Sequence, residues 1–552
     1  MTVDLAAGFD PGSREEWRAL ALSVLRKSGY EGDDPEGRLA TRTPDGVTIV
    51  PLYDEAPELP RPVGHAGPWD VRQRHAHPDP RVTREAILAD LENGVSSLWL
   101  DLASIDPAAL PVVLDGVLLD LAPVVLDAGD RAARAAHAFL QLNETASQLD
   151  DLPGGNLGFA PGDPDLAEFA GRARGGLRLV VVDALAYHDR GAADAQELAA
   201  SITQGVAALR RLTEAGLPVE RAFELIEFRY AATADQFLTI AKLRAARRLW
   251  ARVAEVAGGP PVQLQHAVTS GAMMTARDPW VNMLRTTLAC FAAGAGGADA
   301  VTVQPFDAAL GLPDAFARRI ARNTQSLLVE EAGVARVADP AGGSWYVEHL
   351  TDDLANAAWD LFRQAEKHGE QVIEEAIRQA RASREKDVAR RRRPVTGVSE
   401  FPNLAERIPV REPGPGLPGT PDRYAEPFER LRDLADRQET RPAVFLATLG
   451  PVAVHTARAS FAANLFAAGG VATVTGEVAD YTGAPAVVCV CSSDRLYAEQ
   501  AAQAAAALKA AGAAKVWLAG KGEYEGVDAT LYAGCDALEV LETTFDDLGV
   551  DR

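Results

Sequence analysis

The sequence predicts an α/β protein in which a (β/α)8 barrel is followed by a smaller, doubly wound α/β domain. Three observations lead to this prediction. Eight short apolar runs alternate with longer helical patterns over residues 96–340, a Pro- and Gly-rich stretch follows at 413–421, and the alternation then restarts up to residue 534. Buried strands that alternate with amphipathic helices form parallel βαβ units, and eight such units close into a barrel whose functional groups lie at the carboxyl ends of the strands.

The predicted barrel strands are short runs rich in Val, Leu and Ile. They are 96–102, 123–129, 155–161, 177–183, 223–228, 262–268, 300–305 and 335–340. The second domain repeats the pattern on a smaller scale, with a helix expected from His455 to Ala468. Its five runs, 444–450, 471–476, 486–493, 515–520 and 529–534, predict an open five-stranded sheet.

The clearest barrel helix is predicted from Ala234 to Ala257. Four apolar residues recur at helical spacing, and the sequence GGPP stops the helix. The cations lie off this apolar stripe, which is the pattern of a solvated face. The stripe is Phe237, Ala241, Ala245 and Leu249, and the cations are Lys242, Arg247 and Arg248.

The domain boundaries follow from these patterns. We predict an amino-terminal, partner-binding arm over 1–70 with one helix from Arg14 to Lys27, the barrel over 71–395, a linker over 396–440 and the second domain over 441–552. The basic run Arg390 to Arg393 is typical either of a solvated face or of an ion-pair site between subunits.

Composition excludes several classes of function. A formal net charge of -23 argues against general nucleic-acid binding, because the chain has no excess of cations to displace counterions from phosphates. No apolar stretch is long enough to span a membrane. The chain has four cysteines, and Cys489 and Cys491 alternate in an apolar run that favours a buried strand over a disulfide or metal site. We therefore expect a cytoplasmic protein without a metal site of its own.

Two blocks of sequence carry a family resemblance. They are FRYAATADQFLTIAKLRAARRLW at 228–250 and the segment from TSGAMMTARDPW to DPAGGSWYVE at 269–348. Both resemble acyl-CoA mutases of the methylmalonyl-CoA type, and the chain as a whole resembles their small subunit. The resemblance implies a TIM barrel threaded by the pantetheine chain of coenzyme A and a flavodoxin-like cobalamin domain. It also implies a radical interconversion of succinyl-CoA and methylmalonyl-CoA, which begins with homolysis of the cobalt–carbon bond of adenosylcobalamin.

The cobalamin motif of the family is degenerate here. The motif is Asp-x-His-x-x-Gly, whose His is the lower cobalt ligand and whose Asp orients that imidazole. His455 matches the ligand, but Ala453 replaces the Asp and Arg458 replaces the Gly. The later glycine pair survives only as Ala519-Gly520-Lys521. A lone His at a helix start is usually a polar cap, so His455 is treated as a vestigial match and no cofactor-binding residue is expected.

The barrel also departs from the catalytic pattern. Arg74 stands where the family's Tyr follows Arg-Gln against the reacting thioester, and its guanidinium offers a fork for a carboxylate. The adenosyl-contacting segment His-Thr-Asn-Ala-x-Asp-Glu reads TVQPFDA, in which Thr302, Gln304 and Ala308 replace the His, Asn and Glu. The resemblance therefore implies a barrel without the residues for catalysis.

Tyr187 and His188 are the exception, because they match the Tyr-His pair whose His donates to the thioester carbonyl. The alternative is a retained structural pair, in which Tyr187 caps the barrel and His188 bonds Asp189 or a neighbouring loop. We favour that alternative and expect no catalytic residue in this chain.

These observations favour a non-catalytic small subunit paired with a large catalytic subunit, which would bind the adenosylcobalamin and the CoA thioester. The alternative is a divergent acyl-CoA mutase that is active on its own. A metallochaperone or binding module of the mutase system ranks last, since it would not need a complete barrel.

Overall fold

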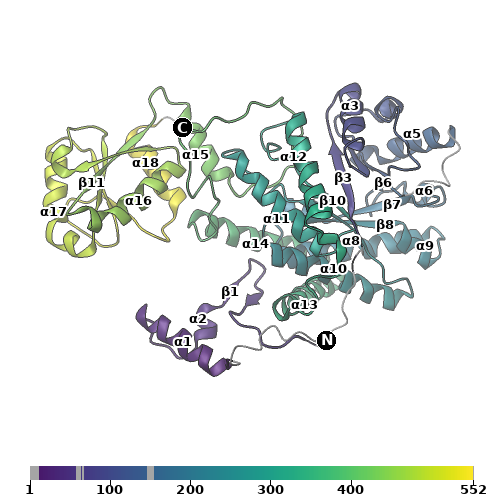
Figure 1. Ribbon diagram of the computed structural model, residues 1–552, viewed down its shortest axis with the longest axis horizontal. Coiled ribbons are helices and arrows are strands. Elements are labelled where there is room, and N and C mark those ends of the chain that lie inside the picture. Colours follow the sequence, from purple (N-terminus) through teal and green to yellow (C-terminus); the bar gives the residue numbers. More distant parts are fainter. Residues whose placement is uncertain (1–11, 58–63, 65–66, 146–153, 551–552) are drawn as a thin grey trace.

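A closed barrel of eight parallel strands forms the larger part of the molecule (Figure 1). The computed structural model describes residues 12–57, 64, 67–145 and 154–550. Around the barrel the strands follow one another in chain order, and the last pairs with the first. The predicted barrel is therefore confirmed. Its strands are β3 (Asp70–His75), β4 (Ser97–Asp101), β5 (Val124–Asp127), β6 (Asn156–Phe159), β7 (Arg178–Asp183), β8 (Ile226–Ala232), β9 (Leu264–Thr269) and β10 (Ala300–Thr302).

Two of the strand predictions were wrong, although the number of strands was right. The first barrel strand is β3, which the search for apolar runs missed because its residues are DVRQRH. The run 335–340 is not a strand: Val334–Arg336 forms a 3-10 turn, and Asp339 has a positive φ of 47°. Asp339 is held there by the side chain of Arg244, whose Nε lies 2.9 Å from its Oδ1.

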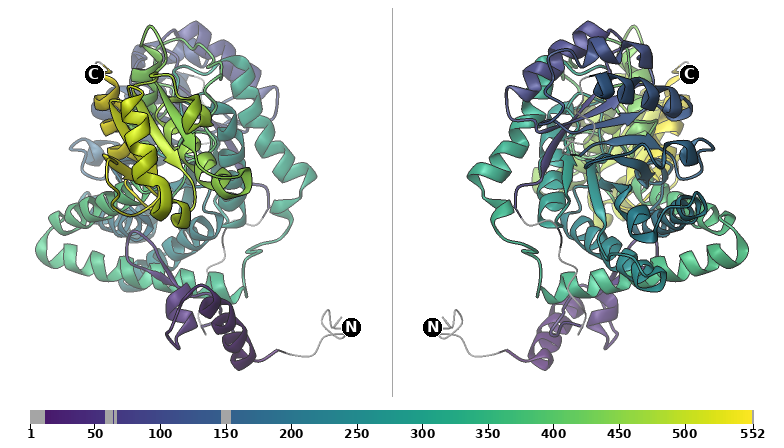
Figure 2. Two further views of the ribbon diagram at one scale, coloured as in Figure 1. Left: turned by 90° about the vertical axis from the view of Figure 1, so that its left-hand side faces the viewer. Right: turned by 90° about the vertical axis from the view of Figure 1, so that its right-hand side faces the viewer.

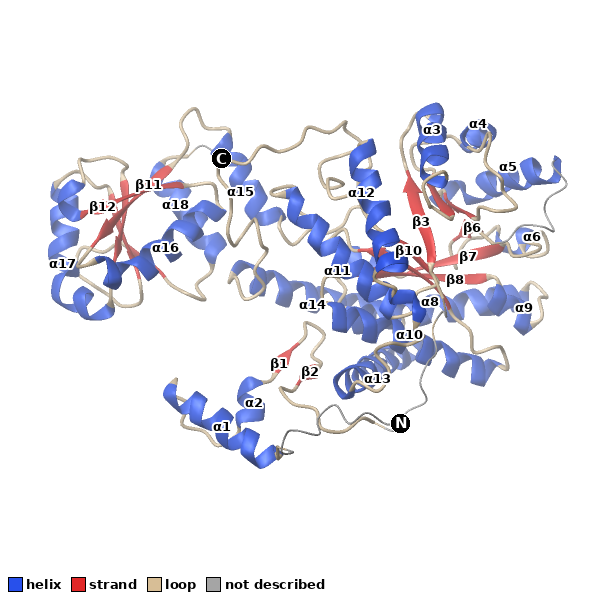
Figure 3. Ribbon diagram, in the orientation of Figure 1, coloured by secondary structure: helices blue, strands red, loops and turns tan. Residues whose placement is uncertain are grey.

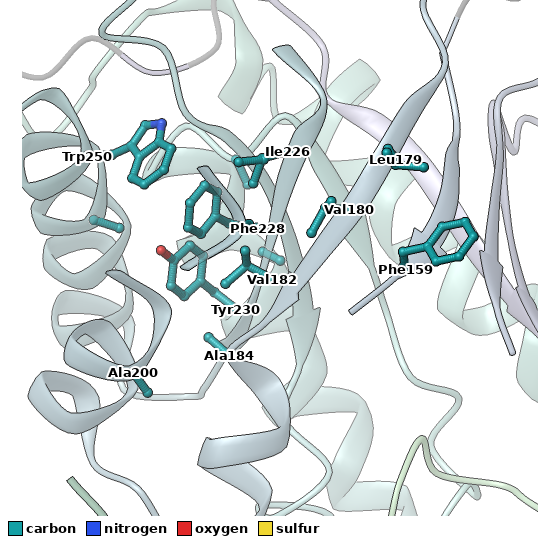
Figure 4. Packing of buried hydrophobic residues seen from close by; sticks show 14 of the residues in the cluster. Phe159, Leu179, Val180, Val182, Ala184, Ala200, Ile226, Phe228, Tyr230 and Trp250 are labelled. Carbon is teal, nitrogen blue, oxygen red and sulfur yellow. The ribbon is translucent and has the colours of Figure 1, made fainter. Parts of the chain in front are cut away.

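The main core lies between the strands and the helices that surround them. Side chains of β8 point outward against α10 (Gln236–Ala257), as Figure 4 shows. The rings of Phe228 and Trp250 meet edge to face with centroids 4.7 Å apart, and both are buried. The surrounding helices include α8 (Asp194–Glu214), α11 (Asn282–Ala295), α12 (Ala315–Ser326), α13 (Trp345–His368) and α14 (Gln371–Ala389).

The cations of α10 do not form a solvated face, which corrects the prediction from sequence. Lys242 is fully buried, and its Nζ lies 2.9 Å from Asp194 and 2.6 Å from Glu197 of α8. Arg247 is also buried and donates to the carbonyl of Gly296 at 2.7 Å. Burial lowers the pKa of Arg247 to about 10. These cations therefore join α10 to its neighbours, and removing one partner of such a pair would leave an uncompensated buried charge.

The carboxyl-terminal domain is an open parallel sheet, as predicted. The strand order β12-β11-β13-β14-β15 is that of a flavodoxin-like fold. Helix α16 begins at Val452, three residues before the predicted start, because Pro451 supplies the extended residue that precedes it. The domain comprises β11 (Ala443–Thr448), α16 (Val452–Ala468), β12 (Ala472–Glu477), β13 (Val487–Cys491), α17 (Asp494–Ala510), β14 (Lys515–Ala519), β15 (Ala529–Leu531) and α18 (Ala537–Leu548).

The amino-terminal segment is an arm that projects from the body of the molecule (Figures 1 and 2). It carries the predicted helix α1 (Arg14–Lys27), the short α2 (Pro35–Leu39) and a two-stranded sheet of β1 (Thr41–Arg42) and β2 (Thr48–Ile49). In the part of the chain that the structure describes, no α1 side chain is buried, and Leu20 is 70% exposed. The arm is thus poorly packed on its own chain.

Between the barrel and the second domain the chain runs largely as loops and then forms α15 (Glu426–Asp436), as the tan and blue ribbons of Figure 3 show. None of the described helices is long and apolar enough to cross a membrane.

Candidate functional site

The bore of the barrel is filled by ion pairs between strands that face each other. Arg72 of β3 pairs with Glu227 of β8, and both side chains are buried. Burial opposes the ionisation of Glu227, but the charges of Arg72, Arg178 and Arg229 and the hydrogen bond from Arg72 together outweigh it, so the pKa of that carboxyl lies below its usual value. Arg229 of β8 donates to Asp127 at 2.9 Å and to Asp183 at 3.0 Å. Because β8 lies across the barrel from β3 and β5, the Arg72–Glu227 and Arg229–Asp127 pairs cross the bore, whereas Asp183 belongs to the neighbouring strand β7.

Trp99 adds bulk at the same level. The guanidinium of Arg229 lies 4.1 Å from the centre of its ring, and that of Arg74 lies 5.8 Å away. The indole Nε1 donates to Asp127 at 3.0 Å. The rings of Trp99 and His266 meet edge to face with their centroids 5.5 Å apart. The centre of the barrel is therefore a packed layer of charged and aromatic groups.

The segment 411–421, here called the strap, crosses the mouth of the barrel. Arg74 Nη2 bonds Asp101 at 2.5 Å, while its Nη1 donates to the carbonyls of Pro415 and Gly416 at 3.2 and 2.9 Å. Gly416 is packed so closely that an added Cβ would lie 2.1 Å from the carbonyl oxygen of Ala308. The fork of Arg74 thus takes a carboxylate of its own barrel, and the strap lies over it.

The strap divides the free space at the mouth. On the side of β3 and β10, a small cavity of about 40 Å³ remains next to Pro415 and Gly416. On the side of β4 to β8, a cavity of about 700 Å³ is lined by Trp99 and by residues 418–420 of the strap. The segment TVQPFDA belongs to this arrangement: Thr302 bonds His266 at 2.8 Å, and the backbone of Ala308 contacts Gly416.

His188 is buried within the structure and bonded there. It lies after β7, and its Nε2 is 2.7 Å from the hydroxyl of Ser270, which follows β9. Its Nδ1 lies 3.6 Å from the carboxylate of Glu197. Burial, together with the nearby charge of Lys242, lowers the pKa of His188 well below its usual value, so the ring is neutral. The ring is engaged by Ser270, a partner that the sequence reasoning did not name.

Tyr187 packs partly against the barrel core, with the guanidinium of Arg190 4.7 Å from the centre of its ring. Tyr187 therefore contacts Arg190, and His188 contacts Ser270 and Glu197. None of these contacts involves Arg74.

The residues that match the cobalamin motif lie on and beside α16 of the second domain. His455 lies inside the first turns of α16, so it is not the cap that the sequence suggested, and its Nδ1 has no hydrogen-bond partner among the described residues. Arg458 pairs with Asp494 at 2.6 Å and lies over the ring of Tyr497 at 5.2 Å.

A Cβ on Gly520 would lie 2.5 Å from Nη1 of Arg458. Without a carboxylate at Ala453 to orient His455, and with a guanidinium against Gly520, these residues do not fit a corrin held by His with its tail along the glycines. The described residues contain no cluster of three His, Cys, Asp or Glu side chains placed to hold a metal ion.

Comparison with known proteins agrees with the family resemblance. The family model described as methylmalonyl-CoA mutase matches residues 164–482. A methylmalonyl-CoA mutase small subunit from Streptomyces virginiae is 53% identical over 99% of this chain and 98% of its own length. The small subunit from Propionibacterium freudenreichii subsp. shermanii is 37% identical over 100% of this chain and 97% of its own.

A methylmalonyl-CoA mutase large subunit from Streptomyces virginiae is also similar, with 29% identity over 72% of this chain and 63% of its own length. The small-subunit relatives thus match nearly the whole chain, while the large subunit matches part of it. This chain therefore belongs to the methylmalonyl-CoA mutase family.

Proposed function

We propose that this chain is the non-catalytic small subunit of a heterodimeric, adenosylcobalamin-dependent methylmalonyl-CoA mutase in the cytoplasm. A large subunit of similar fold binds the adenosylcobalamin and the CoA thioester and interconverts succinyl-CoA and methylmalonyl-CoA. The chain described here supports that subunit and performs no step of the rearrangement.

The contact between Arg74 and the strap carries this proposal. Arg74 takes the place of the ring that the catalytic subunits hold against the thioester, and it bonds Asp101 and two carbonyls of the strap. A thioester in that place would have to displace both the strap and a buried ion pair. The family resemblance implies a pantetheine chain that threads the bore, and the buried Arg72–Glu227 pair occupies part of that bore.

The second domain supports the same assignment. In the family's cobalamin motif a carboxylate orients the His ligand, and Ala453 supplies none. Arg458, bonded to Asp494 and stacked on Tyr497, closes the approach to Gly520.

The arm supports a partner. Helix α1 has helix-capping residues of its own, since Ser13 accepts from Glu16 and Glu16 bonds back to Ser13, yet Leu20 and Val24 stay exposed at 70% and 63%. A capped helix that leaves its apolar residues uncovered is suited to a second chain.

The test compares the purified chain alone, the large subunit alone and the two together. After incubation with adenosylcobalamin and desalting, visible absorption measures the retained cofactor, and conversion of succinyl-CoA measures activity. The chain alone is expected to retain no cobalamin and to turn over no substrate, whereas the pair co-elutes, retains cobalamin and is active.

A variant with Ala453→Asp and Arg458→Gly is the matched control. It restores the carboxylate beside His455 and removes the guanidinium beside Gly520, so it is expected to retain more cobalamin than the wild type. Cobalamin-dependent turnover by the wild-type chain without a partner would favour a divergent acyl-CoA mutase and would contradict the proposal.

A further inference from the structure

A second groove lies at the outer rim of the barrel's carboxyl end, where Pro44 of the arm also borders it. It lies between the start of α10, the outer face of α11 and the segment 393–396, and it has a volume of about 440 Å³. We call it the α11 groove. Its apolar walls are Leu238, Met273, Val281, Leu284, Leu288, Val395 and Tyr424, and its charged residues are Asp194, Asp235, Arg285, Arg384 and Arg393, with His188 at its inner end.

The wall formed by α11 is unusually poor in charge for an outer barrel helix. Across residues 279–298 the sequence holds a single charged side chain, Arg285, in a chain that is 24% charged. Leu284 and Leu288, one helical turn apart, are 67% and 45% exposed. Exposed apolar residues together with a local loss of charge are typical of the centre of a protein interface.

Three arginines and two carboxylates line the groove, so its formal charge is positive. Asp194 is held by Lys242 at 2.9 Å, and Asp235 accepts from the backbone N–H of Leu238 at 3.3 Å. Arg393 is exposed, and the described residues place no carboxylate within 4.0 Å of it.

The other two arginines are fixed by neutral groups. Arg384 donates to the carbonyl of Gly191, and Arg285 donates to the carbonyl of Thr396 at 2.6 Å. Three guanidinium groups that form no ion pair within 4.0 Å among the described residues, in a chain of net charge -23, make this groove a local site of positive charge.

We propose that the α11 groove binds an acidic, amphipathic segment of the large subunit, whose apolar side chains pack on Leu284 and Leu288 and whose carboxylates pair with Arg393 and Arg285. This inference rests on the proposed heterodimer and names part of its interface. A second copy of this chain is disfavoured as the occupant because both copies would bring the same cationic groove. An apolar segment with spaced carboxylates satisfies both the walls and the charges.

The test measures the Kd between this full-length chain and the large subunit by a titration at two ionic strengths. Leu284→Glu and Arg393→Glu are each expected to weaken binding by about tenfold or more, and for Arg393→Glu the dependence of Kd on salt is expected to decrease. Val256→Glu and Lys367→Glu make the same changes at exposed positions elsewhere on the barrel and are expected to leave the Kd unchanged. Circular dichroism confirms that each variant is folded.

The outcomes separate the two proposals. If the wild-type chains do not associate, the proposed heterodimer fails. If they associate and the groove variants bind like the wild type, only the groove assignment fails. A photo-crosslinker at position 288 is expected to capture a carboxylate-bearing segment of the large subunit. Capture of a segment without carboxylates, or of a second copy of this chain, would overturn the assignment.

Discussion

Nη1 of Arg74 and the carbonyl oxygen of Gly416 lie 2.9 Å apart, although 342 residues separate them in the chain. The same guanidinium bonds Asp101, so one side chain joins β3, β4 and the strap. Arg74 thus ties the strap to the β3 and β4 side of the barrel mouth.

Replacing Arg74 by Ala is expected to release the strap and to destabilise the chain by about 3 kcal/mol, since Asp101 is left partly buried without its cation. Urea denaturation measures the loss of stability, and hydrogen exchange measures the opening of residues 411–421. Arg74→Lys keeps the charge but loses the forked guanidinium, so its free energy of unfolding is expected to lie between those of the wild type and Arg74→Ala. Unchanged exchange in the strap of Arg74→Ala would show that other contacts hold it.

The stability of the chain is expected to fall between about pH 4 and pH 8 because of Asp189. Burial, with the neighbouring charges of Asp183, Glu197 and Asp422, raises the pKa of Asp189 to about 8 from a usual value of 3.8. The folded chain therefore keeps a proton that the unfolded chain releases above about pH 4. The contribution of this group is complete below about pH 4 and is lost as the pH rises to about 8.

Asp189→Asn removes this titration. The free energy of unfolding of the variant, relative to that of the wild type, is therefore expected to rise by about a few kcal/mol between pH 5 and pH 8. Free energies of unfolding measured across this range test the prediction. A constant difference between the two proteins at all pH values would mean that Asp189 does not titrate in this way.

Lys242→Met is expected to destabilise the chain by about 3 to 5 kcal/mol, because Glu197 would stay buried opposite an uncharged side chain. Adding Glu197→Gln should recover part of the loss. The two single variants and the double variant form a cycle whose coupling energy is read from urea denaturation. Additive losses would contradict a direct pairing of the two charges.

The thiols are expected to react in two classes. Cys290, Cys489 and Cys491 are buried, whereas Cys535 is partly exposed. Titration of the native chain with a chromogenic disulfide should therefore give one fast thiol, and four after denaturation. Cys535→Ser should abolish the fast phase. Any fast thiol that remains in that variant would reveal local opening of the sheet.

Much of the fold was predictable, and the errors have physical causes. Apolar runs identify strands whose neighbours on both faces are apolar, but β3 directs Arg72 and Arg74 into a polar bore and so shows no such run. The opposite error arose at 335–340, where apolar residues lie in a loop held by Asp339. The burial of Lys242 could not be predicted from the sequence, because the carboxylates that pair with it belong to another helix.

The departures of the candidate site from its family were readable at Arg74, Ala453 and Arg458, because each replaces a residue of a known motif. The contacts that result were not readable: the strap is remote in sequence from β3, and Ser270 lies 82 residues from His188. The sequence PGPG at 413–416 was the one local signal, since glycine there permits a close approach of two backbones.

The strap has a mechanical consequence for the rest of the molecule. The strap has the composition of a flexible linker, but hydrogen bonds hold it at two places. Arg74 donates to its carbonyls, and the carbonyl of Asp189 accepts from the amide of Asp422 at 2.8 Å just after it. Few residues remain before α15, which packs in the same hydrophobic cluster as the flavodoxin-like sheet, so a movement of that domain relative to the barrel is expected to require breaking these contacts first.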